Sequence, residues 1–118
     1  MSQNPCKVLL VVIGDFIAQR FDLATELLVI EIQGGRLLAP PREIILDSAS
    51  PEELCKIIFD NNIQVVVCGG IEERHHQFLS WKKIQVFDNV IGSSQLAMDR
   101  LCRGQLKAGD ILLYSQAG

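Results

Sequence analysis

Several side chains that can bind a metal or an anion lie at the end of one apolar stretch of the sequence. Cys68 ends the run 63–68, Gly69-Gly70 follows it, and His75 and His76 come shortly after. A thiolate suits iron–sulfur clusters and a neutral imidazole ligates many metals. Glycines before a helix let an anion approach the helix N-terminus. The sequence therefore predicts a ligand site at the end of this stretch.

Each of these residues also has a purely structural interpretation. A lone cysteine in a valine-rich run is often a small buried apolar residue. His75 and His76 are adjacent, so on a helix they point about 100° apart and cannot chelate one ion together. His75 shares its helical face with apolar residues, which favours a buried, hydrogen-bonded imidazole and leaves His76 as the more exposed ligand. Glutamates at 72 and 73 suit a helix start that binds no anion.

The elements around this site follow from the apolar pattern. Residues 63–68 and 7–13 are almost continuously β-branched or leucine, which predicts two strands buried on both faces. Residues 26–32 alternate as a third strand. After a hairpin turn at 33–36, the return strand contains Pro40-Pro41 and so belongs at the sheet edge.

Three helices are predicted between and after these strands. Ser50-Pro51 begins the first, with serine at the N-cap and proline at the first helical position. The second spans about 72–81 and is followed by a short strand at 84–87. The third is capped by Ser93 or Ser94 and stops at Gly104. We expect the apolar tail 111–114 to pack on its own sheet or on a partner.

The order of these elements predicts the fold. An antiparallel meander followed by βαβ crossovers is the ribonuclease H-like arrangement, a three-layer α/β fold with a mixed five-stranded sheet and helices on its faces. With 118 residues the chain is predicted to be a single domain, 1–118.

Composition excludes several classes of function. The formal net charge is −3 and no Lys/Arg cluster stands out, which argues against nucleic acid as a partner. Every apolar run is far shorter than the roughly 20 residues that span a bilayer, so no membrane partner is expected. The four cysteines form no Cys-x-x-Cys pair and are predicted to be reduced. The N-terminal residues lack a secretory signal, so we expect a cytoplasmic protein.

Three segments of the chain are distinctive when taken together. They are the opening strand with the loop leading through Phe21 and Ala24 into 27–30, the stretch 63–71 with its Gly69-Gly70 turn, and 84–87 with the last helix up to Leu106. In their order and spacing they resemble the dinitrogenase iron-molybdenum cofactor biosynthesis family, the NifX-like carriers. Family members commonly carry a Ser-x-His-Phe-Gly-Arg-Ala pattern in the first loop. In this chain Arg20 stands where the histidine would be, and a guanidinium cannot coordinate a metal but can pair with an anion.

The resemblance implies a small non-catalytic accessory protein of nitrogen fixation that holds an iron-molybdenum or iron-sulfur cluster, or its precursor, between assembly steps. Its partners would be cofactor-assembly proteins or nitrogenase components, and the chain could form a homo-oligomer. The predicted crevice contains Arg20, Phe21 and Gly69-Gly70 for cofactor binding, with metal ligands among the residues Cys68, His75 and His76.

Two alternatives stay open. The first is an interaction or regulatory module on the same fold that has lost cluster binding. The second is a metal-dependent hydrolase that uses Asp15 and Asp88, which both follow strands, although turn formation also explains aspartate at these positions.

Overall fold

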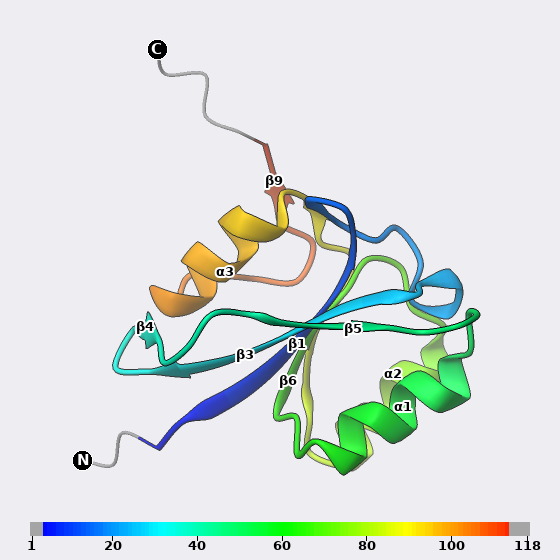
Figure 1. Cartoon of the computed structure of the whole chain (residues 1–118). Helices are drawn as coiled ribbons and strands as arrows, with labels where there is room; N and C mark the ends of the chain where they lie inside the picture. The colour runs from blue at the N-terminus through cyan, green and yellow to red at the C-terminus, as the bar shows by residue number, and fades with distance from the viewer. Residues whose placement is uncertain (1–3, 114–118) are drawn as a thin grey trace.

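The protein, described here for residues 4–113 of a computed structural model, consists of a mixed β-sheet with helices on both faces (Figure 1). The central strand β1 (Cys6–Ile13) pairs antiparallel with β3 (Glu26–Gln33) and parallel with β6 (Val65–Val67). β7 (Gln85–Phe87) lies parallel to β6 at one edge. At the other edge β4 (Arg36–Leu37) and β5 (Arg42–Ile45) both pair with β3. These two strands are the predicted return strand, interrupted at Pro40-Pro41.

Strand β1 separates two apolar cores because its side chains alternate between the faces of the sheet. Leu9 and Val11 face one core, which contains residues of α1 (Pro51–Asp60) and α2 (Glu73–Trp81). Val8, Leu10 and Val12 face the other core, which contains residues of α3 (Ser94–Cys102). Figure 1 shows α3 on one side of the sheet and the α1–α2 pair on the other. The predicted α/β fold with a mixed sheet and three helices is confirmed, but the prediction of five strands is wrong, because the sheet of the described residues has seven.

The helix starts agree with the cap residues in the sequence, with one exception. The hydroxyl of Ser50 accepts a hydrogen bond from the Glu53 amide at 3.1 Å, so α1 has the predicted N-cap. Ser93 rather than Ser94 caps α3, because its hydroxyl accepts from the Leu96 amide at 3.1 Å. Helix α2 begins one residue later than predicted, since Glu72 has an extended backbone and forms the N-cap without a side-chain bond.

The loop between β1 and β3 contains two short elements that the sequence pattern did not predict, β2 (Phe16–Ile17) and a 3-10 helix η1 (Phe21–Leu23). Val12 of β1 pairs with Ile17 while it also pairs with Glu26 of β3. Strand β2 therefore lies on the β6 side of β1, where it continues the sheet beyond the end of β6. This places the first loop beside the turn that follows β6.

The predicted tail forms a second, smaller sheet. β9 (Ile111–Leu112) pairs parallel with β8 (Ile91–Gly92), and Leu112 is buried among residues of the α3 core. Tyr114, the last residue of the predicted tail, lies outside the described residues. Between residues 4 and 113, none of the helices has both the length and the apolar character needed to cross a bilayer.

Candidate functional site

The first loop is joined by backbone hydrogen bonds to the turn after β6. The Gly70 amide donates to the carbonyl of Gln19 at 2.7 Å, and the Phe21 amide donates to the carbonyl of Gly70 at 2.8 Å. Arg20 thereby forms a parallel β-bridge with Gly70. The predicted proximity of Arg20 and Phe21 to Gly69-Gly70 is confirmed.

Gly69 is needed because the loop backbone comes so close. A Cβ at this position would lie 2.6 Å from the Gln19 carbonyl oxygen and closer still to that of Ala18. Gly69 is buried, and the Gly70 amide is already used by Gln19. An anion that approaches this turn, as the sequence predicted, therefore cannot use the Gly70 amide. A neighbouring surface hollow of about 290 Å³ is lined by both glycines and by residues such as Gln19 and Asn89.

Cys68 lies within the α1–α2 core with an exposed fraction of 0%. Burial, and to a smaller extent the negative charge of Asp88, raises the pKa of its thiol to about 12. A protonated thiol enclosed by apolar side chains is a poor metal ligand. The geometry thus favours the structural interpretation of Cys68, whose ligand role stays a prediction. All four cysteines of the chain are free thiols.

His75 is buried, as its helical face predicted, with 8% of its surface exposed. Its ring lies 5.8 Å from the ring of Phe21, centroid to centroid. However, its Nε2 atom is buried without a hydrogen-bond partner, whereas the sequence predicted a satisfied imidazole. The nearest charged group given by the structure is the Glu72 carboxylate, 3.5 Å from Nε2, in a geometry that does not make a hydrogen bond. An unpaired buried nitrogen costs free energy unless a ligand or water satisfies it.

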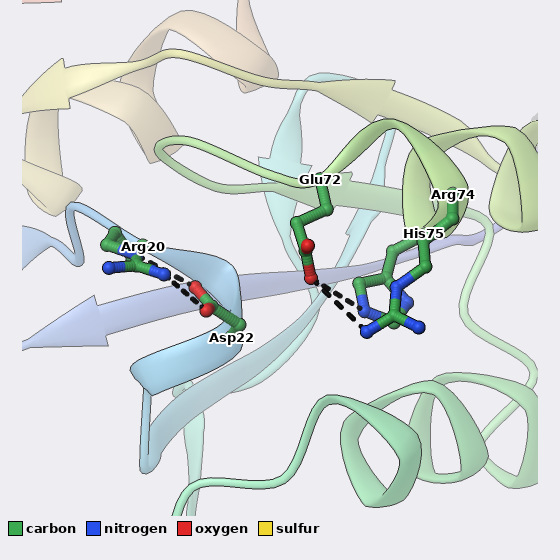
Figure 2. Close-up of polar contacts among 5 residues, drawn as sticks. All are labelled: Arg20, Asp22, Glu72, Arg74 and His75. Carbon is green, nitrogen blue, oxygen red and sulfur yellow. Dashed lines mark hydrogen bonds and ion pairs between the residues drawn. The ribbon is translucent and has the colours of Figure 1, made fainter.

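Arg20 and Asp22 form an ion pair in the same region as this histidine (Figure 2). The Arg20 guanidinium donates two hydrogen bonds to the Asp22 carboxylate, at 3.0 and 2.6 Å. These bonds are the main reason why the pKa of Asp22 is lowered and that of Arg20 is raised from their ordinary values. Smaller electrostatic contributions come from His75 to Asp22 and from Glu72 to Arg20. The four side chains are therefore electrostatically connected across the gap between η1 and α2.

The sequence analysis did not identify three residues that take part in this site: Glu72, Arg74 and Asp22. Figure 2 shows the Glu72 side chain reaching toward both Arg74 and His75. Its carboxylate lies 3.5 Å from a guanidinium nitrogen of Arg74. Both of these side chains are more than half exposed. The sequence signal was the run of three charged residues at 72–74, two glutamates and an arginine, which by itself is also typical of a solvated helix start.

The remaining candidates make their hydrogen bonds with other residues. His76 is half-buried on α2, and its Nδ1 is 3.4 Å from the Ser80 hydroxyl one turn later. Asp15 lies in the β1–β2 turn, where its carbonyl accepts hydrogen bonds from the amide and hydroxyl of Ser94. Asp88 follows β7, and its carbonyl accepts from the Gly109 amide. Within residues 4–113, no three His, Cys, Asp or Glu side chains are grouped as metal ligands.

Comparison with known proteins identifies the fold but no family. No protein-family model matches the chain. No curated protein matches it either. The crystal structure of PH0822 superimposes with a TM-score of 0.77 at 18% identity, covering 86% of this chain and 93% of that one. A protein from Methanocaldococcus jannaschii named "putative dinitrogenase" gives a TM-score of 0.72 at 21% identity, with coverage of 91% and 95%. A Thermotoga protein named "putative NifB protein" gives 0.68 at 13% identity, with coverage of 96% and 99%.

These likenesses extend over almost the whole of each chain, so this protein has the same overall fold as its neighbours.

Proposed function

We propose that this chain is a non-catalytic accessory protein of the nitrogenase-cofactor type, which binds a metal–sulfur cluster or its precursor between η1 and α2. The names of two structural neighbours support this assignment. The strand order β4-β3-β1-β6-β7 supports a ribonuclease H-like classification of the fold. Its partners would be cofactor-assembly proteins or nitrogenase components.

The observation that carries the proposal is the unpaired Nε2 of His75. A neutral imidazole nitrogen that lacks a protein partner is available to coordinate one metal of a cluster. The contact between its ring and Phe21 holds the imidazole in place. Movement of the exposed Glu72 and Arg74 side chains would open the path to Nε2. The guanidinium groups of Arg20 and Arg74 would then face the negative charge of the cluster.

The residues present fit a cluster held by one histidine and by charge, and they do not fit a cluster held by protein thiolates. The Cys68 thiol is in the core, and Arg20 occupies the loop position of the family histidine. We therefore assign the ligand role to His75 ahead of Cys68 and His76. Such sparse ligation suits a carrier that must release its cargo.

Anaerobic reconstitution with iron, sulfide and molybdate tests the proposal. The wild-type protein is expected to gain colour in the visible range and to retain metal after gel filtration. His75→Gln should lose most of this metal, while the adjacent control His76→Gln and the core variant Cys68→Ala should retain it. A colourless wild-type protein, or equal metal in the two histidine variants, would contradict the proposal.

A second candidate function is an interaction or regulatory module that has lost cluster binding. The double hydrogen bond between Arg20 and Asp22 favours it, because a guanidinium already neutralised by a carboxylate attracts an anionic cluster less. A wild-type protein that stays free of metal after reconstitution would favour this alternative.

A further inference from the structure

Three aromatic side chains gather on the outer surface of α1 and α2, toward the ends of these helices. Phe59 of α1 and Phe78 of α2 have ring centroids 6.5 Å apart. Trp81 lies one turn after Phe78. The exposed fractions are 51% for Phe59, 39% for Phe78 and 75% for Trp81. Exposed aromatic side chains close together are typical of protein–protein interfaces, where tryptophan most often dominates the binding energy.

The Lys82 ammonium group lies close to all three rings. Its Nζ atom lies 5.0 Å from the centroid of Phe59, 5.8 Å from that of Phe78 and 4.7 Å from that of Trp81. At these distances the ammonium group attracts the rings by cation–π interaction.

A hollow of about 540 Å³ adjoins this aromatic surface. Phe59 and Lys82 line it on the aromatic side, and Lys7, Asn62 and Glu31 contribute polar groups. A hollow of this size can accept a side chain of a partner, and the amide group of Asn62 is a donor and acceptor that can hydrogen-bond with a peptide backbone. The aromatic surface and the hollow share two residues and so form one continuous face.

Lysines outnumber acidic residues in the segments that contribute to this face, although the whole chain is acidic. Lys83 follows Lys82, and Lys56 lies one helical turn before Phe59. Together with Lys7, these are four of the chain's five lysines. The acidic residues on the face are Glu31 in the hollow and Asp60 next to Phe59. This imbalance favours an acidic partner.

We propose that Phe59, Phe78, Trp81 and Lys82 form a docking surface for an acidic segment of a partner protein that also carries an aromatic or aliphatic side chain. The apolar side chain enters the hollow beside Phe59, and carboxylates of the segment pair with Lys82 and Lys83. A flat anionic membrane would contact the same lysines but would leave the hollow and its amide unfilled, so a protein segment fits better. The inference does not depend on metal–sulfur cluster binding, since none of these residues belongs to the group of side chains around His75.

Trp81 is the only tryptophan of the chain, so its fluorescence reports directly on this surface. The probe is a short synthetic peptide in which glutamate alternates with leucine and phenylalanine, and the matched control replaces each glutamate by lysine. The acidic peptide is expected to shift the Trp81 emission to the blue, saturably, and to protect it from acrylamide. The effect should weaken as salt is added. Equal effects of the two peptides, or no effect of either, would overturn the proposal.

Charge reversal provides a second readout with a labelled peptide and fluorescence anisotropy. Lys82→Glu and Trp81→Ala should each weaken binding of the acidic peptide about tenfold or more, as expected for residues at the centre of an interface. Lys107→Glu changes the net charge equally at an exposed position outside this face, and it should have little effect. Circular dichroism checks that the variants are folded. A Lys107→Glu effect as large as that of Lys82→Glu would show non-specific attraction and contradict the proposal. So would binding to phosphatidylserine vesicles in preference to the acidic peptide.

Discussion

Replacement of Gly69 by alanine tests how the site is built. The added methyl group would lie 2.6 Å from the Gln19 carbonyl oxygen and closer still to that of Ala18, and both atoms belong to the backbone. Backbone cannot rotate away as a flexible side chain can, so the loop must move as a unit. That movement would break the hydrogen bonds between Gly70 and residues 19 and 21, which are 2.7 and 2.8 Å long.

The expected cost follows from these two effects. Overpacking in a filled site costs about 1–3 kcal/mol. Each lost backbone hydrogen bond adds about 1 kcal/mol. We therefore expect Gly69→Ala to lower the free energy of unfolding by about 3 kcal/mol or more, as a sum of these contributions.

Gly70→Ala is the matched control. Its Cβ would meet only the Gln19 carbonyl oxygen, at 3.4 Å, and Gly70 has no positive φ angle that would disfavour alanine. The cost should stay below about 1 kcal/mol. Urea unfolding followed by far-ultraviolet circular dichroism measures both variants. Equal stability of the two variants would refute the close approach of the loop to Gly69.

Three further predictions concern individual groups. The pKa of Cys68 is raised to about 12 in the folded state, so as pH rises the unfolded chain releases this proton first. The free energy of unfolding should therefore fall as pH rises above 9. Urea titrations at several pH values should show a smaller fall for Cys68→Ala. Ser50→Ala should cost about 1 kcal/mol in the same assay through loss of the cap bond, whereas the exposed Ser48→Ala should cost almost nothing. Because hydrogen bonds from Arg20 lower the pKa of Asp22, this pair stabilises the fold at neutral pH and ceases to do so as pH falls through that lowered pKa. Carbon-13 NMR titration should find the Asp22 pKa closer to its ordinary value in Arg20→Gln.

The parts of the fold that were predictable from sequence have strong local signals. The apolar run of β1 identifies a buried central strand, and the Ser50-Pro51 pair identifies the start of α1. Strands of two residues have no measurable periodicity, so β2 and the pairing of Ile91 with Ile111 could not be predicted. The partner of Ile91 is distant in sequence, so only tertiary contacts define that pairing, whereas β2 pairs with β1 across the short turn at Gly14-Asp15.

The candidate site was predictable in position but not in detail. The glycine pair after β6 located it, and the first loop does lie against that pair. The burial of Cys68 depends on helices that cover the sheet, which the local sequence does not report. Likewise, the unpaired Nε2 of His75 results from the absence of a hydrogen-bonding neighbour among the described residues, which no motif encodes.

The alternation of side chains along β1 has a mechanical consequence for the molecule. Leu54 of α1 and Met98 of α3 are buried in separate compartments with the sheet between them. A cavity made in one compartment cannot be filled by side chains of the other. Truncations on opposite sides of the sheet should therefore have additive effects, whereas two truncations in one compartment should not.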